Sequence, residues 1–298
     1  MLDLKPLNES IRCSVGESPV YDDRENALLF ADIPNRTIHS IDLASGAAIA
    51  WTFDTEVGSF GLADSGRLVV ALRHEVGLFD RAGGSFQRLC TIEDGNPDTR
   101  LNDGKVGPDG AFWVGSMDDR GKPAGERKPL GSLYRVDGSG RLDKKVEGLI
   151  TSNGLAWSAD GRLMFHSDSS GLWIDRWAFD PATGAIGART RIVAGIGDGD
   201  GRPDGGATDV EGRYWSAGVS AAKLNRYDAD GRLVASYPVP VAAPTMPCFG
   251  GEDMKTLFVT NLTQGRKPEM LEKYPSSGLT LVGRSPVAGV PVGRFRDG

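Results

Sequence analysis

Six similar units follow one another along the chain, and four of them carry an oxygen-bearing side chain at the same position. This position, which we call the slot, precedes a short apolar run by ten residues, or by eleven in the first unit. Carboxylate and amide oxygens are the ligands that hard divalent cations prefer. The sequence therefore indicates a cation site wherever the slots meet. In chain order the slots hold Glu17, Gly58, Asn102, Asn153, Asp204 and Pro247.

The apolar runs recur at a spacing that is typical of a repeat fold. Successive runs begin 40, 44, 51, 51 and 43 residues apart, and a polar residue followed by glycine precedes most of them. Behind most runs lies a segment that alternates polar and apolar residues, as half-buried strands do. This pattern predicts an all-β, six-bladed β-propeller as a single domain over 1–298, and its regular spacing favours it over a large β-sandwich. The runs are 28–30, 68–70, 112–114, 163–165, 214–215 and 257–259.

A propeller needs its first and last blades to be joined. We expect the N-terminal stretch 4–12 to add the outer strand to the last blade, whose own strands are expected within 248–296. Two long polar loops, 118–129 and 195–206, are expected near the slots, where they would form rims or lids.

Residues just before the inner strands of a propeller gather around one mouth of its central channel. There Glu17, Asn153 and Asp204 would offer two carboxylates and one amide oxygen to a single ion. Three protein ligands leave positions open for water or substrate, as a catalytic ion requires. Asn-Gly and Asp-Gly pairs are also common turns, so it is the in-phase set rather than any one residue that favours a site.

Arg100 lies two residues before the slot residue Asn102. Its guanidinium group would suit a carbonyl or hydroxyl oxygen of a substrate. The spacing equally allows a surface ion pair with Asp98 or Asp103.

Composition and charge limit the other functions. The chain has 298 residues, a formal net charge of −6 and no basic block, which argues against nucleic acid or an anionic membrane as a partner. No apolar run approaches the length of a membrane span, and 1–10 does not read as a signal peptide. Three widely spaced cysteines suit reduced thiols, so we expect a cytoplasmic protein. A closed propeller can be a monomer, and we expect a monomer or a weak oligomer. Three scattered histidines leave little room for a three-histidine zinc site or for Ser–His chemistry.

Five motifs, in order and over residues 12–262, resemble the SMP-30/gluconolactonase/regucalcin-like family. Each motif is weak alone, whereas five in sequence are a specific signal. They are Gly16–Pro19, Arg100–Lys105, Ser152–Leu155, Pro203–Gly205 and Pro247–Gly251.

The resemblance implies a six-bladed propeller that binds one divalent cation and hydrolyses a sugar lactone to the aldonic acid. It implies that Glu17, Asn153 and Asp204 are metal ligands and that Asp204 is also the general base. It further implies that Arg100 and Asn102 contact the substrate. The identity of the cation stays open among Ca²⁺, Mg²⁺, Mn²⁺, Zn²⁺ and Fe²⁺.

The sequence departs from the family pattern in one loop. Animal members carry an acidic residue shortly after a Gly-Thr/Ser-Met stretch, and it contacts sugar hydroxyls. Alignment of Gly115–Met117 with that stretch puts Arg120 at the acidic place. As a substrate-binding residue, Arg120 would suit a carboxylate, sulfonate or phosphate group on the substrate. The alternative is that Arg120 is a solvated loop residue.

Two further functions compete with a lactonase. A calcium-dependent phosphotriesterase would use the same kind of ion on phosphoryl oxygens. A non-enzymatic calcium-binding or protein-binding propeller would use the fold without chemistry.

Overall fold

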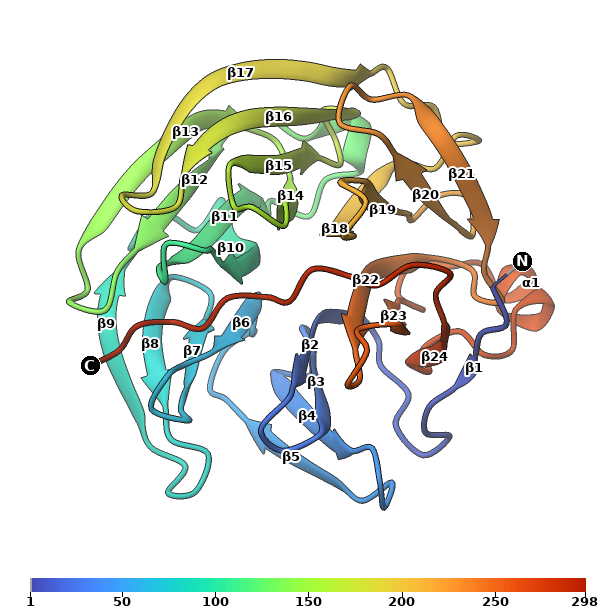
Figure 1. Cartoon of the computed structure of the whole chain (residues 1–298), viewed down its shortest axis with the longest axis horizontal. Coiled ribbons are helices and arrows are strands. Elements are labelled where there is room, and N and C mark those ends of the chain that lie inside the picture. Colours follow the sequence, from blue (N-terminus) through green and yellow to red (C-terminus); the bar gives the residue numbers. More distant parts are fainter. Residues whose placement is uncertain (1) are drawn as a thin grey trace.

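Six four-stranded antiparallel sheets surround a common axis in the structure, a computed structural model that describes residues 2–298 (Figure 1). Each sheet is one blade, and the six-bladed propeller predicted from the repeat is confirmed. The first three blades consist of β2 (Gly16–Asp22), β3 (Ala27–Asp32), β4 (Thr37–Asp42) and β5 (Ala48–Thr52); β6 (Ser59–Leu62), β7 (Leu68–Ala71), β8 (Glu75–Phe79) and β9 (Phe86–Thr91); and β10 (Thr99–Val106), β11 (Phe112–Asp118), β12 (Gly131–Val136) and β13 (Leu142–Leu149).

The remaining three blades continue around the ring in chain order. Two short helices lie in loops, the 3₁₀ helix η1 (Ala124–Glu126) and α1 (Pro268–Lys273). Within residues 2–298, no helix has the length and apolar character that crossing a membrane requires. The strands are β14 (Ser152–Trp157), β15 (Leu163–Asp168), β16 (Trp173–Asp180) and β17 (Ala185–Ala194); β18 (Pro203–Thr208), β19 (Tyr214–Gly218), β20 (Lys223–Tyr227) and β21 (Leu233–Pro238); and β22 (Pro244–Gly250), β23 (Thr256–Asn261), β24 (Leu281–Arg284) and β1 (Lys5–Pro6).

Burial decreases from the axis to the rim of each blade. In the first blade every residue of β3 is buried, whereas β5 is mostly exposed. Neighbouring blades cover both faces of the second strands, and strands buried on both faces read as continuous apolar runs. The apolar runs of the sequence are therefore the second strands of the blades. The slots lie within or directly before the innermost strand of each blade. They therefore belong to the strand that precedes the apolar strand.

Four of the innermost strands contain a β-bulge at the slot. The pairing register shifts between Glu17 and Val20 in β2, and between Asn153 and Ala156 in β14. Equivalent shifts occur at the slots of β10 and β18. In contrast, β6, which follows the glycine slot, pairs in unbroken register. A bulge kinks its strand and re-aims a side chain, so the oxygen-bearing slots coincide with the positions where the strands bend.

The N-terminus closes the ring, as predicted. Strand β1 pairs with β24 of the last blade, although it is shorter than the predicted range 4–12. The predicted range 248–296 for the strands of the last blade is wrong at both ends, because these strands begin at Pro244 and end at Arg284.

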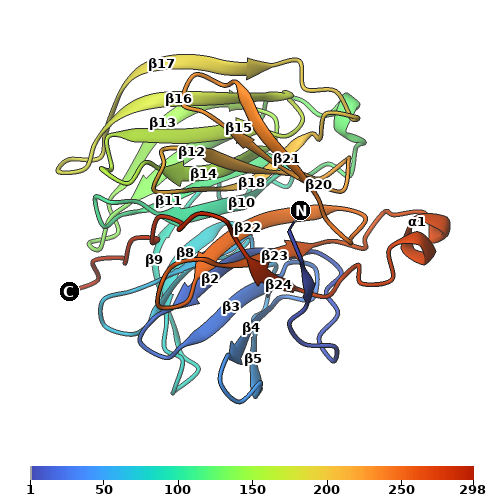
Figure 2. The same ribbon diagram turned by 45° about the vertical axis from the view of Figure 1, so that its right-hand side comes forward.

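The C-terminal tail, residues 285–298, leaves the last blade and crosses the axis of the ring (Figures 1 and 2). It forms isolated bridges to Asp209 in the fifth blade and to Ala63 in the second. The side chain of Phe295 is fully buried in a cluster with residues of the second and third blades. The tail is thus part of the core and covers the axial end at which the innermost strands finish.

Candidate active site at the start of the inner strands

A pocket of about 730 Å³ lies at the axial end where the innermost strands begin. This volume is in the range of small-molecule sites. Both loops predicted as rims contribute lining residues to it, among them Lys122 and Arg202. The slot residues that line the pocket are Glu17, Asn102, Asn153 and Asp204.

Three of these slot residues form a continuous hydrogen-bond chain with Arg100. Arg100 Nη1 donates to Asn102 Oδ1 at 2.9 Å, and Asn102 Nδ2 donates to Asn153 Oδ1 at 3.1 Å. Asn153 Nδ2 donates in turn to Asp204 Oδ1 at 2.7 Å and to Ser169 Oγ at 2.7 Å. This series of hydrogen bonds holds the two amide groups between a guanidinium group at one end and a carboxylate at the other. Side chains from the third, fourth and fifth blades are therefore held in one geometry.

The two slot carboxylates are buried without an ion-pair partner. Glu17 and Asp204 are each 8% exposed, and within residues 2–298 neither forms an ion pair. Burial, together with the charges of Asp204 and Asp103, raises the pKa of Glu17 well above its usual value. Burial and the charge of Asp103 raise the pKa of Asp204 to about 8. Ionising both groups in this place is unfavourable unless positive charge is supplied.

The donor set fits one hard cation. In the described part of the chain, no three His, Cys, Asp or Glu side chains gather as a metal-binding group. A cation here would rest on the two carboxylates and on amide oxygen, an oxygen-only set suited to Ca²⁺, Mg²⁺ or Mn²⁺. The unpaired carboxylates are the feature that a cation would stabilise.

Arg100 lies at the pocket, and its partners differ from those considered from the sequence. Its Nε pairs with Asp119 Oδ1 at 3.3 Å, and its Nη1 also donates to the Leu101 carbonyl at 2.9 Å. Neither Asp98 nor Asp103 forms this ion pair. The side chain is largely buried, which lowers the pKa of Arg100.

Arg120, in contrast, is not brought to the pocket. Its Nε and Nη2 form a bidentate pair with Asp118 at 2.9 and 2.6 Å. Asp118 also accepts a hydrogen bond from the Lys128 backbone N–H at 2.7 Å. Asp118 therefore links the two ends of the 118–129 loop through the Lys128 N–H, and Arg120 holds the Asp118 carboxylate in place.

Two buried charges on β10 have no counterpart among the residues predicted from the sequence. Asp103 is 3% exposed and accepts a hydrogen bond from the Leu155 N–H at 3.2 Å. Lys105 is 7% exposed, and its Nζ donates to the Gly206 carbonyl at 2.6 Å. Both residues lie on β10 next to Asn102, and charged residues in an inner strand are the signal that would have found them.

Comparison with known proteins establishes the family. A family model described as the SMP-30/gluconolactonase/LRE-like region matches residues 15–263. The chain belongs to this family. The resemblance inferred from the five sequence motifs is confirmed.

Members of the SMP-30/gluconolactonase family resemble the chain over nearly its whole length. A 6-deoxy-6-sulfogluconolactonase of Pseudomonas putida is 35% identical, and the match covers 95% of this chain and 97% of that protein. Regucalcin of Gallus gallus is 33% identical over 90% of each chain. The crystal structure of a calcium-binding protein, regucalcin from Agrobacterium tumefaciens, superposes with a TM-score of 0.90 at 26% identity, covering 99% of this chain and 98% of that chain.

Proposed function

We propose that this protein is a divalent-cation-dependent lactonase that opens a sugar lactone to the aldonic acid. The observation that carries the proposal is the pair of buried carboxylates, Glu17 and Asp204, without a counter-ion in a pocket of small-molecule size. A relative at 35% identity that is named as a sugar lactonase supports the reaction class.

Glu17, Asn153 and Asp204 would hold the cation, which when bound polarises the lactone carbonyl and lowers the pKa of water. Ligation by Asn153 requires its amide oxygen, which in this structure faces Asn102, to turn toward Asp204. The calcium-binding neighbour supports a divalent ion, and Mg²⁺, Mn²⁺, Zn²⁺ and Fe²⁺ remain in the proposal beside Ca²⁺.

Asp204 is the proposed general base, which takes the proton from the attacking water. With a pKa of about 8 in the cation-free site, its carboxyl group is largely protonated at neutral pH and a poor base. Nearby positive charge favours the ionised form of a carboxyl group. The buried carboxyl group would thus become a base only in the cation-loaded site.

Arg100 and Asn102 are the proposed substrate-binding residues. The hydrogen bonds of Arg100 use Nη1 and Nε, which leaves its Nη2 donors for a substrate oxygen. Its pairing with Asp119 orients the guanidinium group before the substrate arrives. A positioned donor of this kind stabilises the negative charge that develops on the carbonyl oxygen.

A metal-replacement assay tests the proposal. The protein is stripped with a chelator and refilled separately with Ca²⁺, Mg²⁺, Mn²⁺, Zn²⁺ or Fe²⁺. Opening of glucono-1,5-lactone is followed by proton release, with the spontaneous rate subtracted, beside an aryl phosphotriester. We expect lactone opening to vanish on stripping and to return with at least one cation. Full activity after exhaustive chelation would contradict the cation, and turnover of the phosphotriester alone would contradict the lactone.

A further inference from the structure

Three arginines line the pocket without a part in the proposed chemistry. Arg127 belongs to the loop between β11 and β12, Arg202 directly precedes β18, and Arg266 lies between β23 and α1. They come from the third, fifth and sixth blades, so the ring brings together side chains that are far apart in the sequence. We call Arg127, Arg202 and Arg266 the arginine trio.

The trio has no counter-ion in the protein. Within residues 2–298 none of the three guanidinium groups forms an ion pair, whereas Arg100 and Arg120 at the same side of the ring pair with Asp119 and Asp118. Arg100 and Arg120 are also partly buried, with 16% and 22% of their side chains exposed, so partial burial alone does not account for the difference. The trio therefore differs from its neighbours in offering its charge to the pocket.

Most donors of the trio also lack an acceptor. Arg127 donates from Nε to the Lys122 carbonyl at 3.2 Å and from Nη1 to Thr151 Oγ1 at 3.1 Å. In the described chain, the guanidinium groups of Arg202 and Arg266 have no hydrogen-bond acceptor, and Nε of Arg266 is buried without a partner. A buried donor without an acceptor costs free energy, which a ligand oxygen would offset.

The three charges are close enough to disfavour one another. Burial lowers the pKa of Arg266, and the charge of Arg202 lowers it further. Burial also lowers the pKa of Arg127, where repulsion from Arg202 is opposed by Asp118 and Asp119. Like charges that gather in one pocket without ion-pair partners favour a functional site over a structural one.

The trio lies within reach of the proposed reaction centre. Arg202 is two residues before Asp204 on the chain, and the charges of Arg202 and Arg127 both act on the carboxyl group of Asp204. A small molecule with one end at the trio would therefore have its other end beside Asp204 in the same pocket.

We propose that the arginine trio binds an anionic group with three terminal oxygens, such as a sulfonate or phosphate, on the substrate at the end remote from the scissile ester. Guanidinium groups from three blades in one pocket can each donate to a different oxygen of a sulfonate or phosphate, whereas a planar carboxylate offers only two oxygens. The inference rests on the proposed lactonase function for its substrate, but the binding of the anion can be measured without catalysis.

Calorimetry with two open-chain acids tests the trio directly. Gluconate and 6-phosphogluconate differ only in the phosphate group. The contribution of their shared carboxylate to binding therefore cancels when the two affinities are compared. We expect the protein to bind 6-phosphogluconate at least tenfold more tightly, and Arg127→Gln and Arg266→Gln each to remove most of that preference. Arg88→Gln is the matched control, because Arg88 is exposed on β9, far from the pocket lining, and its loss changes the net charge equally. Equal affinity for both acids in the wild-type protein would overturn the proposal.

Kinetics with the matching lactones separates this proposal from the lactonase itself. We expect the ratio of kcat/KM for 6-phosphogluconolactone to that for gluconolactone to fall about tenfold or more in Arg266→Gln and to recover partly in Arg266→Lys. Opening of both lactones at equal rates in all variants would overturn the trio and leave the lactonase intact. Preferential binding of the phosphorylated acid without opening of either lactone would overturn the lactonase and leave the trio as an anion site. Melting curves by circular dichroism establish that each variant is folded.

Discussion

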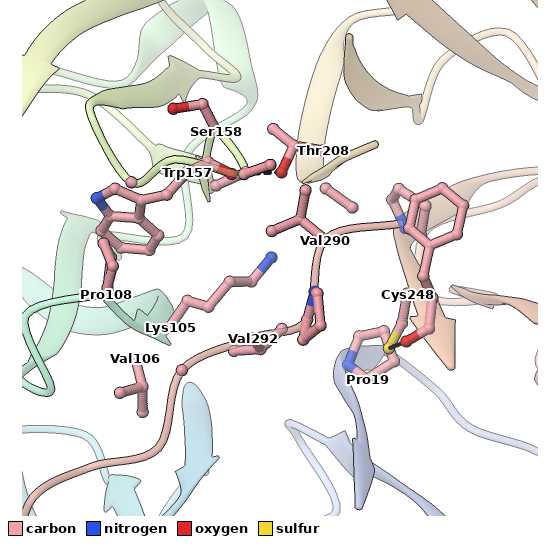
Figure 3. Close-up of a pocket in the computed structure, with 18 residues that line it drawn as sticks. Pro19, Lys105, Val106, Pro108, Trp157, Ser158, Thr208, Cys248, Val290 and Val292 are labelled. Atoms are coloured by element: carbon pink, nitrogen blue, oxygen red, sulfur yellow. Dashed lines mark hydrogen bonds between the residues drawn. The ribbon is translucent and has the colours of Figure 1, made fainter. Parts of the chain in front are cut away.

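The two axial ends of the ring are built from the same six innermost strands, yet they differ in charge and access. The end where the strands begin has a pocket of about 730 Å³ with two buried carboxylates and the arginine trio, none of which has an ion-pair partner in the described chain. The end where they finish has a pocket of about 160 Å³, which the C-terminal tail crosses with Val290 and Val292 (Figure 3). Symmetry of the fold thus does not make the two ends equivalent.

The closed end holds one buried ammonium group, whereas the open end gathers carboxylates and guanidinium groups in one pocket. Lys105 is directed into the small pocket in Figure 3, and its ammonium group donates to the Gly206 carbonyl. Burial lowers the pKa of Lys105, and the charge of Asp103 opposes this shift. The rest of that pocket is largely apolar, with Val106 and Trp157 among its lining residues. In this fold one end of the ring therefore contributes mainly to stability, and the other end holds the charged groups that could perform chemistry.

Removing a carboxylate from the open end should give the largest effect. We expect Asp204→Asn to lower kcat/KM for lactone opening about 10²- to 10⁴-fold, the contribution of a general base. Because the carboxyl group of wild-type Asp204 is ionised only above its pKa of about 8, the cation-free variant should also melt at a higher temperature than the wild type above that pH. Asp198→Asn, in the exposed part of the same loop, is the matched control. Activity retained in Asp204→Asn would break the assignment of chemistry to this end.

Disturbing the closed end should change stability and leave the chemistry in place. Phe295 is fully buried, and Phe→Ala changes in a core cost about 3–5 kcal/mol of unfolding free energy. We expect this loss for Phe295→Ala in urea unfolding, with lactone kcat/KM nearly unchanged at 25 °C. Ile49→Ala, at a position 59% exposed on β5, should change the unfolding free energy little. A large loss of kcat/KM in folded Phe295→Ala would show that the two ends are coupled.

The raised pKa values at the open end predict how cation binding depends on pH. The pKa of Asp204 is about 8 in the cation-free protein, so its carboxyl group carries a proton below that pH. Because the folded-state pKa exceeds the unfolded one, the cation-free protein should lose stability as the pH rises from about 4 to about 8. Cation binding must release the proton, so affinity should rise by about tenfold per pH unit up to pH 8.

Calorimetry in two buffers of different ionisation enthalpy measures this proton release. We expect at least one proton per bound cation near pH 7 in the wild type, and fewer in Glu17→Gln, because the pKa of Glu17 is raised as well. A cation affinity that is independent of pH between 5 and 8 would contradict the burial of uncompensated carboxyl groups at this end.

The smallest effect is expected at the rim of the open end. If Arg120 acts only by fastening its loop through Asp118, then Arg120→Gln, Asp118→Asn and the double variant should each lower kcat/KM by a similar factor. That factor should be less than about fivefold, because neither Arg120 nor Asp118 lines the pocket. A loss confined to Arg120→Gln and to anionic lactones would instead support the direct contact that the sequence suggested.

The propeller ring and the slot positions could be predicted from the sequence, because both depend on the repeat. Glu17, Asn153 and Asp204 each lie at a nearly constant spacing before an apolar run. This spacing can be recognised in a single sequence without knowing how the loops fold. The bulges that turn these side chains to the axis leave no comparable signal. The pairing of Arg120 with Asp118 was likewise beyond reach, because loop conformation decides which of several nearby carboxylates an arginine meets.

The arginine trio and the C-terminal tail were unpredictable for a related reason. Arg127, Arg202 and Arg266 occupy different positions in their units, so no periodicity links them. Residues 285–298 were assigned to the last blade because its strands were expected to run on to 296, whereas contacts with two other blades hold them across the axis. Contacts between distant repeats form only when the ring is closed, so they cannot be predicted from the sequence of any one repeat.

The engagement of both chain ends has a consequence for biosynthesis. The first blade-forming residue to leave the ribosome, Lys5 in β1, waits for a partner strand that is made last, since β24 spans Leu281–Arg284. Until β24 has been synthesised, the sixth blade exposes an unpaired edge, a liability for aggregation. The ring therefore stays an open arc until residues 281–284 have been made, and the pairing of β24 with β1 then closes it.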